Sequence, residues 1–451
     1  VGYVSNERYV ALPNILFEFR SQSTVTTAHS TISGAVYADL TPGPYEVVLG
    51  GDGFGSKIVQ IQLSDSEPHQ FRLLSDSLLG YMWPKCVKAD KYSEFRVHAV
   101  CEYELELWRY GAEKEFVRRI GTFDEHGPRA TMQITPDGDY TPESGRYHLY
   151  VSYACPWACR VLSLLHLKGL TEHITVSSVH PTWQRTRPND PDDQHAGWCF
   201  LGEDGASISG PSGVGSFPGG PKHACTPDDL FGSVFVRDLY DRAMDGAAKG
   251  TRFTVPILWC KKTDTIVSNE SSEIIRDLNS QFNDIAGDKA LDLYPVELRP
   301  AIDEVNEWVY HGINNGVYKC GFATSQGAYD TAVTELFRCL DKCEEILGRQ
   351  RYIAGDVLTE ADVRLFPTLV RFDEVYVVYF KTNKKFIHQY PNLWNYVKDV
   401  YQTPGVRHSV NMWHIKTHYF TSHPVLNANA IVPIGPNLNL DEPHDRARFS
   451  K

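Results

Sequence analysis

Long hydrophobic runs, clusters of basic residues and Cys-x-x-Cys pairs are all missing from this sequence. No apolar stretch approaches the roughly 20 residues that a membrane-spanning helix needs, so we expect no membrane partner. The net charge is −12 and the basic residues are interspersed with acids, which argues against a nucleic-acid partner. The first residues do not combine a basic segment with an apolar one, so we expect no signal peptide.

The 10 cysteines are scattered singly along a chain of 451 residues. This pattern is typical of reduced thiols, and we therefore expect a cytoplasmic protein. Cys339 and Cys343 share one face of an expected helix, and His414, His418 and His423 have a spacing similar to that of zinc ligands. Neither group has the further ligands that such a site needs, so we expect core packing and no metal.

The first third of the chain, residues 1–140, consists of short alternating segments separated by Gly and Pro turns. Residues 45–49, 57–63 and 95–100 are examples, and the pattern predicts a small β-sandwich. Residues 79–85 and 129–140 are similar to the β-rich N-terminal part of dimethylformamidase-like large subunits. The catalytic core of such proteins does not follow here, so this likeness implies a binding or packing module.

The stretch from Arg146 to Arg160 predicts a strand followed by a helix. Cys155 comes directly before Pro156, which suits the first position of a helix. A thiol at a helix start faces free N–H groups and the positive end of the helix dipole, so we expect a lowered pKa and a nucleophilic thiolate. The alternative is a buried cysteine without chemistry. Cys159 lies one turn further, a spacing that favours a one-cysteine mechanism with a small external thiol.

Three later segments belong to the same expected α/β domain of thioredoxin-like arrangement. Residues 181–225 form a long irregular segment that is typical of a functional loop. Trp198 within it either packs in the core or is an aromatic anchor of a functional site. The Val255-Pro256 bond interrupts an apolar strand, and we predict that it is cis. Residues 268–273 open a helix with capping side chains, whose free N–H groups are also suited to a carboxylate.

From about residue 295 the apolar period becomes helical, and the pattern predicts an all-α domain. Thr359 and Asp362 form a capping box. The expected organisation is a β-rich module (1–140), a thioredoxin-like domain (141–290), a helical domain (291–436) and a tail (437–451). The expected helices cover residues 296–317, 328–347, 360–379, 393–402 and 406–414.

These motifs together resemble the xi class of glutathione transferases, the glutathionyl-hydroquinone reductases. The likeness covers residues 140–436 and rests on the strings 147–158, 255–259, 265–275, 314–324, 358–373 and 414–420. It implies glutathione as co-substrate, aromatic quinol conjugates as partners, and a homodimer. It also implies Cys155 as nucleophile, Tyr318 and Tyr419 in the aromatic-substrate pocket, and a glutathione site made of Trp198, Arg252, Val255, Glu270 and Ser271.

The activity that the likeness implies is reduction of a glutathionyl-hydroquinone through a mixed disulfide between Cys155 and glutathione. Two alternatives stay open: a broader cysteine-type transferase (thioltransferase, dehydroascorbate reductase or reductive dehalogenase), or an interaction module without turnover. Cys159 stands where the family usually has His, the loop 181–225 is longer than expected, and the N-terminal module is not a family feature. Whether Cys159 takes part and what the module binds are therefore open at this point.

Overall fold

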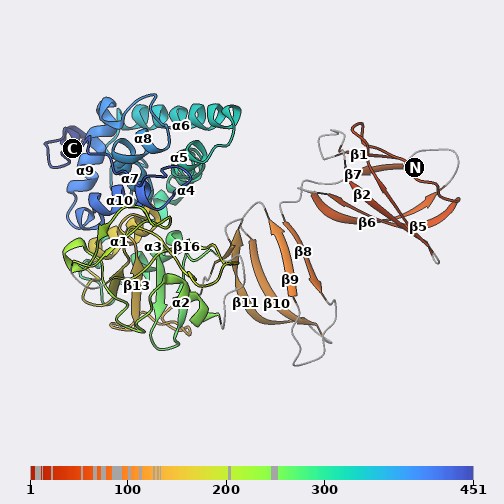
Figure 1. Cartoon of the computed structure of the whole chain (residues 1–451), viewed down its shortest axis with the longest axis horizontal. Helices are drawn as coiled ribbons and strands as arrows, with labels where there is room; N and C mark the ends of the chain where they lie inside the picture. Colours follow the sequence, from red (N-terminus) through yellow and green to blue (C-terminus); the bar gives the residue numbers. More distant parts are fainter. Residues whose placement is uncertain are drawn as a thin grey trace. The chain divides into compact units, whose positions relative to one another are not determined.

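The computed structural model describes residues 2–5, 12, 14–21, 24–51, 54–63, 69–72, 78–83, 94–99, 103–110, 114–124, 127–129, 132, 134–201, 205–244 and 252–449. Cys86, Cys101 and residues 84–85 of the stretch 79–85 lie outside these ranges. The chain divides into two compact units, Val1–Arg129 and Ala130–Lys451 (Figure 1). Within the described ranges, no helix combines the length and the apolar character needed to cross a membrane.

The regular secondary structure among the described residues of the N-terminal unit consists of strands (Figure 1). The alternation predicted for this region is seen in β2, where Phe17 and Phe19 are buried and their neighbours face outward. Phe71 on β7 packs edge-on against Phe17 with 5.0 Å between ring centroids, so two sheets share one apolar core. Those sheets have the orders β4-β1-β7 and β3-β2-β5-β6, while β8-β9 and β10-β11-β12 form two more. The bounds are β1 Gly2–Ser5, β2 Leu16–Arg20, β3 Val25–His29, β4 Ala35–Val36, β5 Gly43–Gly51, β6 Phe54–Leu63, β7 His69–Arg72, β8 Leu78–Trp83, β9 Glu94–Ala99, β10 Tyr103–Tyr110, β11 Lys114–Asp124 and β12 Gly127–Arg129.

The second unit begins with a four-stranded sheet of order β14-β13-β19-β20. Strand β13 is buried along its whole length, as expected for a central strand covered on both faces. It pairs parallel with β14 and antiparallel with β19, and α1 supplies the crossover that a parallel pair requires. The bounds are β13 Tyr147–Val151, α1 Pro156–Leu167, β14 Thr175–Ser178, β19 Ile257–Cys260, β20 Thr265–Ser268 and α3 Ser271–Ser280. This is the predicted strand-helix-strand order.

The predicted irregular segment 181–225 contains only short elements, and its beginning is attached to the last long helix. Thr182 Oγ1 lies 2.9 Å from Thr421 Oγ1, and the N–H of Trp183 donates to Ser422 Oγ at 3.0 Å. The elements are β15 Gln184–Arg185, β16 Ala196–Gly197, β17 Ser207–Ile208, β18 Phe217–Pro218 and η1 Pro221–His223, followed by α2 Val236–Ala243. Helix α2 was not predicted from the sequence.

The rest of the unit is helical, as predicted, and packs against α1 and α3 (Figure 1). The capping box at Thr359 and Asp362 is confirmed. The predicted helix 406–414 is wrong, because the Asn411 side chain accepts from the N–H of His414 and starts a new helix there. The bounds are η2 Val296–Leu298, α4 Arg299–Val309, η3 Tyr310–Asn314, α5 Gly316–Gly321, α6 Gln326–Leu347, α7 Glu360–Arg371, η4 Phe372–Tyr376, α8 Val377–Tyr379, η5 Ile387–Gln389, α9 Pro391–Gln402, η6 Val406–Ser409, α10 Met412–Thr421 and η7 Arg446–Phe449.

Candidate active site

Cys155 is the N-cap residue of α1, directly after the turn that follows β13. Pro156 occupies the first helical position, as the sequence predicts. The thiol is 8% exposed and donates to the carbonyl oxygen of Val255 at 3.3 Å. The nucleophile candidate therefore faces the backbone segment that leads into β19.

The expectation of a lowered pKa at Cys155 is wrong in its direction. Burial raises the pKa of the thiol, while the N–H groups of Ala158 and Trp157 and the charge of Arg371 oppose that effect. The helix-start contribution is thus present, but desolvation of the charged form outweighs it. Sequence reasoning weighed only the helix terminus and had no measure of how deeply the thiol is buried.

The Val255-Pro256 bond is cis, which confirms the prediction made from the sequence. Val255 is 3% exposed and directs its carbonyl oxygen toward Cys155. Arg252 lies three residues earlier with an exposed side chain. Of these two candidate glutathione residues, Val255 is the one in direct contact with the thiol.

Glu270 and Ser271 lie at the start of helix α3, and the predicted capping is confirmed for Glu270, the N-cap residue. The Glu270 carboxylate accepts from the N–H of Ser272, and Ser271 is buried at the first helical position. Arg160 on α1 reaches Ser271 Oγ at 3.5 Å. This contact connects the start of α3 to the helix that Cys155 caps.

Trp198 is buried against the last long helix of the chain. Its ring stacks on His418 with a centroid distance of 4.5 Å, and the ring of Trp183 meets it edge-on at 5.6 Å. Burial lowers the pKa of His418 well below its usual value, so this imidazole is neutral at physiological pH. His418 precedes Tyr419 on α10, so Trp198 lies against the helix that carries one of the candidate tyrosines.

Tyr318 and Tyr419 are brought together, as their shared assignment to one pocket requires. Their hydroxyl oxygens are 2.6 Å apart, and the hydroxyl of Tyr376 lies 3.0 Å from that of Tyr419. Burial raises the pKa of all three phenols, so each keeps its proton at neutral pH. Sequence reasoning missed Tyr376, because one tyrosine among 24 in a helical pattern carries no distinguishing signal.

Cys159 is buried one turn after Cys155, and its sulfur lies 3.4 Å from Ser409 Oγ. All eight described cysteines are free thiols, as expected for reduced cysteines. Cys159 therefore occupies a position near the nucleophile, and no bond joins the two sulfur atoms.

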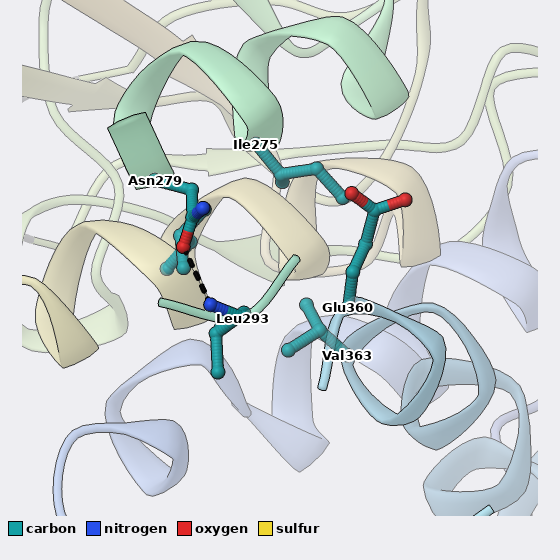
Figure 2. Close-up of a pocket in the computed structure, with 6 residues that line it drawn as sticks. Ile275, Asn279, Leu293, Glu360 and Val363 are labelled. Carbon is teal, nitrogen blue, oxygen red and sulfur yellow. Dashed lines mark hydrogen bonds between the residues drawn. The ribbon is translucent and has the colours of Figure 1, made fainter. Parts of the chain in front are cut away.

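A small cavity between α1, α3 and α7 lies apart from these groups (Figure 2). In it the Asn279 side chain accepts from the N–H of Leu293 at 2.8 Å, and the Glu360 side chain extends toward Ile275 (Figure 2). Its lining is Leu164, Ile275, Asn279, Leu293, Glu360 and Val363. None of these is a candidate site residue, so the cavity is a packing gap where the α/β and helical parts meet.

Comparisons with known proteins agree with this arrangement. Residues 154–281 match the family model of the glutathione S-transferase N-terminal domain, and residues 326–399 match that of the C-terminal domain. The glutathionyl-hydroquinone reductase YqjG of Escherichia coli is 49% identical over 312 residues, which cover 69% of this chain and 86% of that protein. The glutathionyl-hydroquinone reductase PcpF of Sphingobium chlorophenolicum is 44% identical over 300 residues, with 66% and 86% covered.

Solved structures give the same result. The glutathione-bound structure of YqjG from Escherichia coli matches with a TM-score of 0.62 and 45% identity, covering 70% of this chain and 96% of that one. The xi-class transferase of Natrialba magadii matches with a TM-score of 0.62 and 42% identity, covering 71% and 89%. The chain therefore belongs to the glutathione transferases, and within them to the xi class.

Proposed function

We propose that this chain catalyses the glutathione-dependent reduction of glutathionyl-hydroquinones to hydroquinones, with Cys155 as the nucleophile. The observation that carries the proposal is the Cys155 thiol at the start of α1, against the carbonyl of Val255. The names of the two relatives described above support the same activity.

Glutathione is the co-substrate in this proposal, and the residues present suit its three parts. Val255 has a backbone edge beside the thiol, which suits pairing with the cysteinyl peptide unit. At the start of α3, the Ser271 hydroxyl and the helix terminus suit the carboxylate of the γ-glutamyl end, and the Glu270 carboxylate suits its ammonium group. Trp198 and Arg252 would lie along the glycyl side.

In the first step the Cys155 thiolate attacks the sulfur that joins glutathione to the hydroquinone ring. A sulfur–sulfur bond forms, the carbon–sulfur bond breaks, and its electron pair goes to the ring carbon. That carbon needs a proton as it leaves, and protonated phenols are suitable donors. Tyr318 and Tyr419 fill this role, because burial keeps both in the neutral form.

In the second step the thiolate of another glutathione attacks the mixed disulfide and releases Cys155. The net reaction joins two glutathione sulfurs in one disulfide and replaces the carbon–sulfur bond of the conjugate by a carbon–hydrogen bond. Two electrons pass from glutathione to the ring, and no metal or further oxidant takes part.

Turnover of a glutathionyl-hydroquinone with excess glutathione tests the proposal, in the parent protein and in Cys155→Ser. We expect hydroquinone release in the parent and its loss in the variant, with glutathione binding retained. Activity on mixed disulfides, dehydroascorbate or halogenated hydroquinones without activity on quinol conjugates would instead indicate a broader cysteine-type transferase. Binding of glutathione without any turnover would indicate an interaction module.

The remaining proposals concern organisation. We infer a β-rich module (1–140), a glutathione-binding domain (141–290), a helical domain (291–436) and a tail (437–451). The shared core of the first two sheets supports a small β-sandwich within the first module. A homodimer and a cytoplasmic location follow from the family likeness and stay predictions, which size-exclusion chromatography with light scattering and cell fractionation would test.

A further inference from the structure

Arg371, the last residue of α7, is a completely buried cation that donates to three backbone carbonyls and also interacts with the Cys159 thiol. Its Nη2 donates to the carbonyl of Tyr153 at 3.0 Å, and its Nε donates to the carbonyl of Ala154 at 3.3 Å. Its Nη1 donates to the carbonyl of Pro367, one turn earlier on α7, at 2.8 Å. The guanidinium thus spans from the helical domain to the two residues directly before Cys155.

This buried charge has no carboxylate partner within 4 Å among the residues that the structure describes. Burial of a cation without an anion is costly, and proteins usually pair such charges. Lys416, by contrast, is a buried cation that lies 3.3 Å from the Glu374 carboxylate. An anion that forms close to Arg371 would therefore be stabilised.

Most ionisable groups around Arg371 are neutral, so few of them could be the anion that its charge stabilises. Tyr376 and Tyr419 keep their protons because burial raises the pKa of each, and His418 is neutral. Tyr318 on α5, whose hydroxyl meets that of Tyr419, is protonated for the same reason. The thiol of Cys155, whose pKa the charge of Arg371 lowers against the effect of burial, is then the candidate for that anion.

We propose that Arg371 is a positioning residue that holds the turn before Cys155 in place and puts a positive charge beside that turn, where it favours the Cys155 thiolate. The inference rests on the proposed function, which needs that thiolate in a buried site. The fork of the guanidinium fixes two consecutive carbonyls, so it sets where the N-cap of α1 lies. The charge offsets the desolvation that burial imposes on the ionised sulfur.

The test is the pH dependence of Cys155 alkylation by iodoacetamide, followed by peptide mass spectrometry so that the other cysteines do not interfere. We expect Arg371→Met to move the alkylation midpoint upward by about one pH unit, the low end of the effect of a nearby opposite charge. The alkylation rate at neutral pH would then fall about tenfold. Arg371→Lys keeps the charge but loses the fork, so its midpoint should stay close to that of the parent while turnover falls.

Arg446 provides a matched control. It is also completely buried and donates to three backbone carbonyls, those of Leu347 at the end of α6 and of Gln350 and Arg351 just after it. Arg446→Met removes an equivalent set of hydrogen bonds without touching the Cys155 turn, so the midpoint should not move. Equal midpoints in Arg371→Met and Arg446→Met would overturn the proposal.

Two further arms keep the test decisive. If Arg371→Met does not fold, a midpoint in Arg371→Lys that rises by a full unit or more overturns the electrostatic role. A fall of the Cys155 midpoint by a full unit or more in Cys159→Ala would also overturn it, because Arg371 would then have been paired with the other thiol in the parent protein. Alkylation needs no substrate, so it is independent of turnover. If the parent protein showed the expected midpoints but no turnover of glutathionyl-hydroquinones, the proposed function would be refuted and the role of Arg371 would not.

Discussion

Replacement of Tyr419 by Phe gives the most specific test of the proposed chemistry. The change removes one hydroxyl that lies 2.6 Å from that of Tyr318 and 3.0 Å from that of Tyr376. Two buried hydrogen bonds are lost, so we expect a loss of about 2 kcal/mol in the free energy of unfolding, at about 1 kcal/mol for each bond. The aromatic ring stays, so no large cavity is left.

The expected effect on activity depends on the leaving group. General acid catalysis contributes about 10²- to 10⁴-fold, and Tyr318 remains as a second donor. We therefore expect Tyr419→Phe to lower kcat for a glutathionyl-hydroquinone by about 10²-fold, the low end of that range. Reduction of a small mixed disulfide releases a thiolate and needs no proton on carbon, so its rate should change by less than about threefold, since that step lacks the general acid contribution.

Both reactions are measured as initial rates at saturating glutathione, together with chemical denaturation of each variant. Tyr379→Phe is the control, because its buried hydroxyl bonds His423 at 3.1 Å and is not part of the three-tyrosine cluster. An equal loss of both reactions in Tyr419→Phe would mean that the hydroxyl supports the fold and not proton transfer. No loss in either would remove Tyr419 from the mechanism.

Three further predictions concern stability and organisation. Glu360→Gln removes a carboxylate whose side chain is 4% exposed and which pairs at 3.0 Å with Arg364, a largely buried cation, so we expect a loss of about 3 kcal/mol in denaturant unfolding; an unchanged midpoint would contradict it. Burial lowers the pKa of His148, His414 and His423 to about 4. The unfolded state therefore binds more protons than the folded state between pH 6.5 and 4, and the melting temperature should fall as the pH drops through that range. A melting temperature that does not change with pH would refute this. Residues 130–451 expressed alone should keep turnover within about twofold, since every candidate site residue lies in that unit; loss of activity in a folded fragment would give the first unit a direct role.

The local chemistry of the chain predicts much of this fold. Pro156 marks the start of α1, the Thr359 and Asp362 box marks the start of α7, and the Pro in an apolar strand marks the cis bond at Val255. Each is a short-range preference that the rest of the protein does not need to override. Neighbouring residues are therefore sufficient to place these features.

Other features depend on contacts between distant parts of the chain. Arg371 reaches residues more than 200 positions earlier, and Tyr376 becomes significant only through its contact with Tyr419. The raised pKa of Cys155 likewise results from the packing of separate segments around one sulfur atom. No spacing rule within a single sequence connects such partners, so sequence reasoning could not find them.

The attachment of the segment 181–225 has a consequence for protein engineering. Its first residues bond to Thr421 and Ser422 at the end of α10, and Trp198 stacks on His418 of the same helix. A chimera that exchanges this segment alone would lose those three attachments at once and would misplace Trp198. A transplant that carries residues 412–422 along with the segment keeps both sides of each attachment from the same protein. It is therefore the smallest exchange that moves the segment between homologues without losing these contacts.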